Sequence, residues 1–227
     1  ETAVHCKADK AQKGITLMLS LVMAAVLAVS AAMPAQADDV DELRRYFELP
    51  AEDPDAIIGI CDTKDKGSDY AFLPAAYVYG NDYYIDDCVC DNSLPNIVDA
   101  RLVDILLRCK VKMCRFESNS AGGRVAEKVQ NEVKKRGGIT RITTKFTTAN
   151  KETKIIVNSA WVKEHCLFKD DSLYKRQSDY GRMMDMLGSY TVAGKNKHDD
   201  VPDGMAMLAE FAQSLSGARV EVFQRPW

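Results

Sequence analysis

The chain has 227 residues, of which 46% are hydrophobic and 28% are charged, and its formal net charge is -3 at pH 7. This composition is ordinary for a globular protein and can supply the core of one domain with an appendage, or at most two small domains. The slight negative charge disfavours a protein that coats nucleic acid with a generally basic surface. An enzyme that acts on nucleic acid is not excluded, because a site built of carboxylates makes the metal-free chain more acidic.

The first 37 residues have the pattern of a secretory signal. Three lysines precede an apolar run at residues 17–32, and the sequence Ala35-Gln36-Ala37 follows it. The run is short and rich in alanine for a membrane span, so we expect no stable membrane partner. The alternatives are a buried helix, or unrelated sequence joined to a truncated gene, since the chain begins at Glu1 rather than at a methionine.

The next part of the chain predicts three strands. Residues 38–55 suit a short amphipathic helix and a linker. The apolar run 57–61 predicts a buried strand, and residues 70–79 and 83–89 predict two more, separated by the turn Gly80-Asn81-Asp82. Three strands joined by short turns should form an antiparallel meander.

Beyond residue 94, helices and strands alternate. The apolar spacing predicts, in order, helix 95–108, strand 111–116, a helix between Gly123 and Gly137, strand 139–146, helix 150–162, strand 166–168, a helix around 180–187 and a last helix from Pro202. The whole order predicts an α/β fold, with a mixed five-stranded sheet of an antiparallel meander plus parallel strands, flanked by helices. The predicted domain spans residues 56–216, followed by a C-terminal tail at 217–227.

The cysteines are spread along the chain without a CxxC pair, at positions 6, 61, 88, 90, 109, 114 and 166. Several of them lie in strand-like runs, which favours buried free thiols. A disulfide framework is the alternative, although a chain of this length can form a core without one.

Acidic residues stand where the predicted strands end. Asp62 follows the first strand, Glu117 ends the fourth, Asp199 and Asp200 precede the last helix, and Asp203 lies in its first turn. If the first and fourth strands are parallel neighbours, Asp62 and Glu117 emerge at the same end of the sheet. Clustered carboxylates suit two Mg²⁺ or Mn²⁺ ions, which can hydrolyse a phosphodiester together. Singly, each acid can also be a turn residue, a helix cap or a surface charge.

Four runs resemble the nuclease domain of the large terminase subunit of tailed bacteriophages, a ribonuclease H-like domain. Residues 57–87 resemble its opening hairpins, with an Asp at a strand end and an Asp-Tyr after a glycine turn. The run FESNSAGG at 116–123 resembles its second acidic motif. NKETKI at 150–155 and HDDVPDGMA at 198–206 resemble the segments that follow.

The resemblance implies roles for particular residues. It implies that Asp62, Glu117 and Asp200 are the catalytic metal ligands, that Asp199 and Asp203 support them, and that Asp69 is a further metal-binding acid. Near these motifs, the candidate DNA contacts are Lys145, Lys154, Lys195, Lys197 and His198. The alternative for the basic residues is a solvated surface, and for His198 a role in ordering its loop.

The resemblance also implies a biological setting. It implies two-metal cleavage of double-stranded DNA during phage genome packaging in the host bacterial cytoplasm, with the portal or the small terminase subunit as partners. The family carries an ATPase motor ahead of the nuclease, but no GxxxxGK[ST] phosphate loop occurs in this sequence.

Other functions remain open from the sequence. The chain could be another ribonuclease H-like nuclease, related to resolvases or transposases, or a non-catalytic terminase fragment that acts only as a folded docking module. A secreted binding protein is a further alternative that rests on the first 37 residues alone.

Overall fold

The computed structural model describes residues 43–63, 69–119, 122–192, 194, 196 and 198–216. The predictions for the signal-like segment and for the C-terminal tail therefore lie outside the described residues. Within the described part, every helix is too short or too polar to span a lipid bilayer.

A single seven-stranded sheet organises the domain, with the strand order β1-β7-β4-β3-β2-β5-β6. The strands are β1 (Arg44–Tyr46), β2 (Ala56–Cys61), β3 (Ala71–Tyr79), β4 (Asp82–Asp91), β5 (Met113–Glu117), β6 (Arg141–Lys145) and β7 (Cys166–Lys169). The helices are α2 (Pro95–Arg108), α3 (Gly122–Lys135), α4 (Lys151–His165), α5 (Asp179–Ser189) and α6 (Asp200–Ser216), with a short 3-10 helix at Asp171–Leu173.

The predicted antiparallel meander is confirmed in β2, β3 and β4. Gly80 makes the tight turn between β3 and β4 with a φ of 62°, a conformation that glycine adopts without steric cost. On the other side of β2, strand β5 pairs in parallel, with Cys61 opposite Phe116, and β6 pairs in parallel with β5. The carboxyl ends of β2, β5 and β6 therefore lie at the same edge of the sheet.

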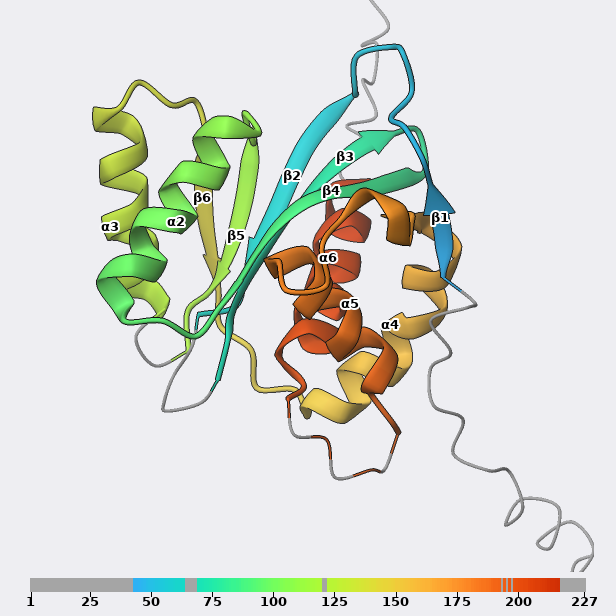
Figure 1. Cartoon of the computed structure of the whole chain (residues 1–227). Helices are drawn as coiled ribbons and strands as arrows, with labels where there is room; N and C mark the ends of the chain where they lie inside the picture. Colours follow the sequence, from blue (N-terminus) through green and yellow to red (C-terminus); the bar gives the residue numbers. More distant parts are fainter. Residues whose placement is uncertain are drawn as a thin grey trace, which may run out of the picture. The chain divides into compact units, whose positions relative to one another are not determined.

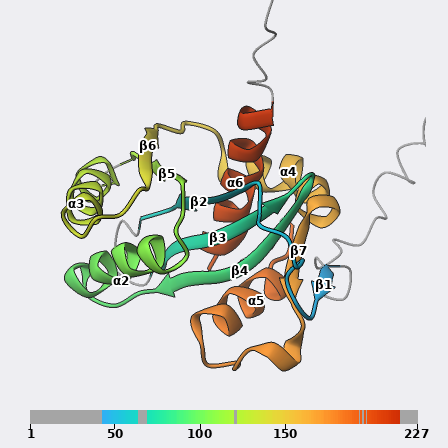
Figure 2. The same cartoon turned by 90° about the horizontal axis from the view of Figure 1, so that it is seen from above.

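Helices cover the sheet on both faces. Figure 1 shows α2 and α3 on one side of the strands and α4, α5 and α6 on the other, and Figure 2 shows the same layers from above. Alternate side chains of one strand enter the two cores: Ile58 and Ile60 pack toward α6, while Cys61 packs in the core of α2 and α3.

The helix ends follow local rules. Pro95 opens α2, where its missing N–H costs no hydrogen bond. The Asn150 side chain caps α4 by accepting from Thr153 N at 3.1 Å. Past the end of α3, Gly137 has a φ of 77°, as the glycine pattern predicted.

The sequence prediction for residues 38–49 is wrong in the described part, where Arg44–Tyr46 forms strand β1 instead of a helix. This strand pairs in parallel with β7. The Tyr46 ring is buried, and its hydroxyl donates to Ile85 O at 3.2 Å. Such pairing is a tertiary contact that outweighs the local helical spacing.

The α/β class and the mixed sheet are confirmed, but the sheet has seven strands rather than five, because the strand predicted at 166–168 joins it as β7 and the unpredicted β1 pairs with β7. The last helix begins at Asp200 rather than at Pro202. The six described cysteines are buried and free, so the prediction of buried thiols is confirmed for them.

Gly204 allows α6 to lie directly on the sheet. A Cβ at this position would lie 2.3 Å from Cδ1 of the fully buried Phe72. We expect Gly204→Ala to lower the free energy of unfolding by about 1–3 kcal/mol, because the added methyl overpacks the core. Urea unfolding should be compared with Gly123→Ala in α3, where a Cβ meets nothing within 4 Å. Equal stability of the two variants would contradict the close approach.

Candidate metal centre

Three carboxylates from three elements meet at the edge where β2 and β5 end. One side-chain oxygen each from Asp62, Glu117 and Asp203 lies within 4.8 Å of the other two. Asp62 directly follows β2, and its backbone exchanges hydrogen bonds with Phe72 at 3.0 and 2.9 Å. Glu117 is the last residue of β5, and Asp203 lies in the first turn of α6. The parallel pairing of β2 and β5 thus brings Asp62 and Glu117 together.

These acids line a polar cleft with a volume of about 280 Å³. Its walls come from the ends of β2 and β5, the start of β3, the segment between β6 and α4, and the first turns of α4 and α6. The lining residues are Asp62, Thr63, Asp69, Glu117, Asn119, Thr147, Ala149, Lys151, Lys154, Asp200 and Asp203.

The three acids of the last motif lie in different surroundings. Asp203, expected to support the site, is the member of the compact group, and its side chain is almost fully buried. Asp200 lines the same cleft but accepts a hydrogen bond from Tyr70 N at 3.1 Å. Asp199 is half exposed and pairs with Lys151 at 3.1 Å.

Burial raises the pKa of all four inner acids. The pKa of Asp62 lies well above its usual value, first because of burial and then because of repulsion from Glu117, Asp203 and Asp200. Burial is also the largest cause of the raised pKa values of Glu117, Asp200 and Asp203. The site therefore gathers negative charge that the surrounding protein neutralises only in part.

Two lysines of α4 supply the nearest positive charge. Lys154 Nζ lies 2.5 Å from Asp203 Oδ1, and both side chains are almost completely buried. Lys151 Nζ lies 3.8 Å from both Asp200 Oδ1 and Asp203 Oδ2. Burial lowers the pKa of Lys151, but the surrounding carboxylates more than offset this effect and leave it above its usual value. Lys154, a candidate DNA contact from the sequence, is thus placed inside the acidic cluster.

Sequence reasoning did not identify Asn119 and Thr147 as site residues. Asn119 Nδ2 donates to Thr147 O at 3.0 Å, and Thr147 N donates to Asn119 Oδ1 at 3.2 Å. A hydrogen bond from the Thr147 side chain lowers the pKa of Glu117 against the larger effect of burial. Asn119 belongs to the recognised motif FESN, but nothing in the sequence indicated that Thr147, 28 residues later, is its hydrogen-bond partner.

The remaining candidate DNA contacts lie at the rim or outside the described residues. Lys145, the last residue of β6, is exposed and pairs with Glu210 at 2.6 Å. The His198 ring lies edge-on to Tyr70, with the ring centroids 5.2 Å apart. Lys195 and Lys197 are outside the described residues.

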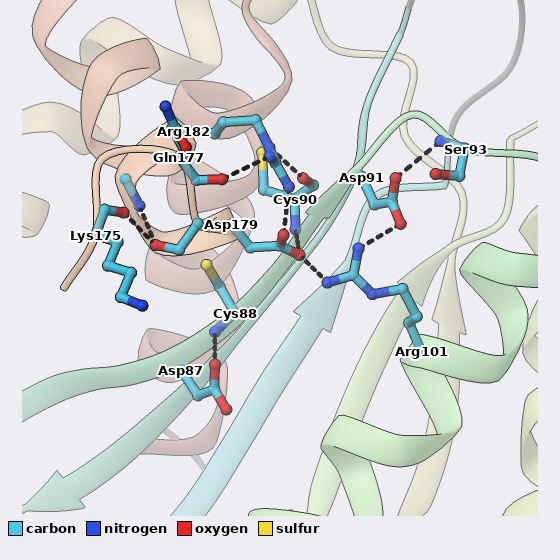
Figure 3. Close-up of polar contacts among 12 residues, drawn as sticks. Asp87, Cys88, Cys90, Asp91, Ser93, Arg101, Lys175, Gln177, Asp179 and Arg182 are labelled. Atoms are coloured by element: carbon cyan, nitrogen blue, oxygen red, sulfur yellow. Dashed lines mark hydrogen bonds and ion pairs between the residues drawn. The ribbon is translucent and has the colours of Figure 1, made fainter.

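A second group of charges lies where β4 meets α5 and α2 (Figure 3). Asp179 Oδ2 accepts from Cys90 N at 3.0 Å and from Arg101 Nη2 at 2.7 Å, and Arg101 also pairs with Asp91. Burial acts to raise the pKa of Asp91, but hydrogen bonds from Ser93 and Arg101 bring it to about 2. The pKa of Asp91, an acid with an arginine partner, is therefore shifted in the opposite direction to the pKa values of the cleft acids.

The donor set of the cleft fits a divalent cation. Carboxylate oxygens are the ligands that Mg²⁺ and Mn²⁺ prefer. Among the described residues, Asp62, Glu117 and Asp203 are the one group of three acidic, His or Cys side chains close enough to share an ion. In the described part of the chain, five acids but only two lysines line the cleft, so a bound cation would balance part of the remaining negative charge.

No protein-family model matches the chain, and no curated protein sequence matches it. Several solved structures, however, superimpose on the chain. The nuclease domain of the human cytomegalovirus terminase, soaked with Mn and bound to an inhibitor, superimposes with a TM-score of 0.58 at 12% identity, over 82% of this chain and 97% of that domain. The nuclease domain of the large terminase subunit gp2 of bacterial virus Sf6 gives a TM-score of 0.50 at 8% identity, over 70% of this chain and 89% of that domain.

The large terminase of a thermophilic bacteriophage gives a TM-score of 0.51 at 12% identity, over 77% of this chain and 43% of that protein. At such identities the likeness shows the fold. The chain therefore has the fold of terminase nuclease domains, which confirms the resemblance found in the sequence motifs.

We expect Asp62→Asn to stabilise the metal-free protein at pH 7.5. Because the pKa of Asp62 is raised in the folded state, stability is lost as the pH rises above the unfolded value of about 4. The neutral amide avoids this loss, so the advantage should shrink at pH 5. A gain of about 1 kcal/mol would raise the melting temperature by about 2–4 °C in a chain of this size.

Thermal unfolding in EDTA at both pH values measures this effect. Asp82→Asn, at an exposed acid that pairs with Arg44, is the control and should change stability little. A lower melting temperature for Asp62→Asn than for the unsubstituted chain at pH 7.5 would contradict the charge argument.

Proposed function

We propose that the chain is a metal-dependent endonuclease that cleaves double-stranded DNA with two Mg²⁺ or Mn²⁺ ions. The observation that carries the proposal is the group of Asp62, Glu117 and Asp203 in the cleft, at the carboxyl ends of two parallel strands. The fold adds support, since the human cytomegalovirus nuclease domain that superimposes on this chain was soaked with Mn.

The chain's own residues would divide the work of holding the ions. Asp62, Glu117 and Asp203 would bind one ion between them, and Asp200 and Asp69 line the side of the cleft where a second can lie. Bound divalent ions activate a water molecule and stabilise the leaving oxygen of a phosphodiester. Thr147, held by Asn119, would fix the orientation of the Glu117 carboxylate.

The two lysines of the cleft would have different roles. Lys151 pairs with Asp199 and lies near Asp200 and Asp203. With these carboxylates engaged in holding ions, the Lys151 ammonium would be free to contact a phosphate of the substrate. Lys154 is buried more deeply and would stay beside Asp203, where it limits the net charge of the site.

The proposed substrate is double-stranded DNA, bound with little sequence preference because the chain carries no recognisable base-reading motif. Lys145, Lys195, Lys197 and His198 are the proposed phosphate contacts around the cleft. The proposed setting is phage genome packaging in the host cytoplasm, with an ATPase motor, and with the portal or the small terminase subunit as partners.

We expect the full chain to nick supercoiled plasmid in the presence of Mn²⁺ or Mg²⁺ and to stop when EDTA is added. Asp62→Ala and Asp203→Ala should each reduce the rate by at least about 100-fold, because each removes an oxygen ligand from the buried group. The same assay on Asp200→Ala tests whether the acid bonded to Tyr70 N also serves as a ligand.

Asp82→Ala is the control, since Asp82 lies on the surface in a pair with Arg44. Calorimetric titration with Mn²⁺ should show binding by the unsubstituted chain that is weakened in Asp203→Ala. A folded chain that neither cuts plasmid nor binds Mn²⁺ would overturn the proposal and favour a non-catalytic docking module. Cutting that survives both substitutions would show that the activity comes from elsewhere.

A further inference from the structure

One strip of the sheet lies open beside the metal centre. Arg115 of β5 places its guanidinium 4.2 Å from the ring centroid of Phe211 of α6, which identifies the face of β5 turned toward α6. In the parallel register, Arg115 lies opposite Thr143 of β6. Arg141 and Lys145, two residues before and after Thr143, therefore share its face.

Helix α6 packs mainly on β2 and β3. It contacts the strip through Phe211 and Ser214 at Arg115 and through Glu210 at Lys145. Strand β6 is the edge strand, and Arg141, Thr143 and Lys145 are all exposed. On the opposite face α3 packs against β5 and β6, and Figure 2 shows α3 and α2 on that side.

The charge of the strip is positive. It carries Arg115, Arg141 and Lys145, and Glu210 pairs with Lys145. Within the described part of the chain, no ion pair involves Arg141. On the opposite face, which α2 and α3 cover, the comparable cations have acidic partners. Lys128 pairs with Asp99, and Arg136 pairs with Asp104.

The strip begins at the cleft. Lys145 lies directly opposite Glu117 in the register, so its backbone is next to a member of the carboxylate group. From Lys145 to Arg141 the strand covers four residues, or about 13 Å at about 3.3 Å per residue. That length matches about four base-pair steps of duplex DNA at about 3.4 Å each.

We propose that the strip formed by Arg115, Arg141, Thr143 and Lys145 binds the phosphate backbone of duplex DNA on one side of the cleavage site. The inference rests on the proposed nuclease function and adds the surface that the substrate follows away from the metals. Arginine, lysine and threonine side chains are common phosphate contacts that position DNA without reading its sequence. The four side chains of the strip are polar or charged, although Ile139 and Phe146 are exposed beyond the two ends of β6. Such side chains suit a phosphate backbone better than an added peptide strand, which is usually recognised by apolar pockets.

The test compares the full chain with Arg141→Gln by fluorescence anisotropy on a labelled 30-base-pair duplex, with Ca²⁺ in place of Mn²⁺ so that bound DNA stays intact. Loss of one phosphate contact should weaken binding by about eightfold at 0.1 M salt and reduce the salt slope by about 0.9, whatever the duplex sequence. Thr143→Val, which removes only a hydroxyl, should weaken binding less.

Lys135→Gln is the matched control, because Lys135 is an exposed cation on α3 with one acidic neighbour, Glu132. It should bind DNA as the unsubstituted chain does. Equal losses in Arg141→Gln and Lys135→Gln would show a general charge effect and overturn the strip. Unchanged affinity and salt slope in Arg141→Gln would also overturn it.

Hydrolysis of bis(p-nitrophenyl) phosphate by the unsubstituted chain with Mn²⁺ tests the proposed function separately. If the unsubstituted chain hydrolyses this substrate and Arg141→Gln binds DNA normally, the DNA-binding role of the strip is contradicted and the nuclease function is supported. If DNA binding is weakened in Arg141→Gln but not in Lys135→Gln, and the unsubstituted chain does not hydrolyse the substrate, the DNA-binding role of the strip is supported and the nuclease function is contradicted.

Discussion

The parallel pairing of β2 with β5 is the constraint on which the candidate site depends. It places the carboxyl ends of two buried strands side by side, so Asp62 and Glu117 project from one edge although they lie far apart in the sequence. A third carboxylate can join them only because α6 lies close to the sheet. Gly204 allows that approach, since its missing side chain leaves room for Phe72.

This arrangement opposes the stability of the metal-free protein. Burying several carboxylates together is unfavourable, which is why the pKa of Asp62 and of its neighbours is raised. Lys151 and Lys154 reduce the repulsion without removing it. The Arg101 network at β4 shows what a purely structural cluster looks like here, because its acids have arginine partners and the pKa of Asp91 is low. A cleft in which acids outnumber their lysine partners is suited to holding cations.

The sheet is covered unevenly. Its central strands are packed on both faces, which makes the strand ends rigid supports for the acids. Helix α3 covers one face of β5 and β6, while on the other face Arg141, Thr143 and Lys145 of the edge strand β6 are exposed. Exposed edge strands are usually protected by charge, and Arg141 and Lys145 supply it here. The same cations lie next to the cleft, so protection of the edge and attraction of a polyanion can come from the same side chains.

Much of this protein could be read from local sequence. Apolar runs and turn residues predicted the meander, the alternation after residue 94 and the α/β class, because these patterns reflect which backbone faces are buried. The strand-end positions of Asp62 and Glu117 were equally visible. Strand β1 was not visible, because so short a strand carries too weak a pattern and its partner β7 lies far from it in the sequence.

The tertiary structure alone decided which side chains of the last motifs enter the cleft. Asp199 precedes α6, and Asp200 and Asp203 lie about 60° apart around it, so the spacing of these acids does not say which of them joins Asp62 and Glu117. The packing of α6 on β3 through Gly204 sets the rotation of the helix and turns Asp203 inward. The packing of α4 beside α6 likewise buries Lys154 against Asp203, where its sequence suggested a surface cation.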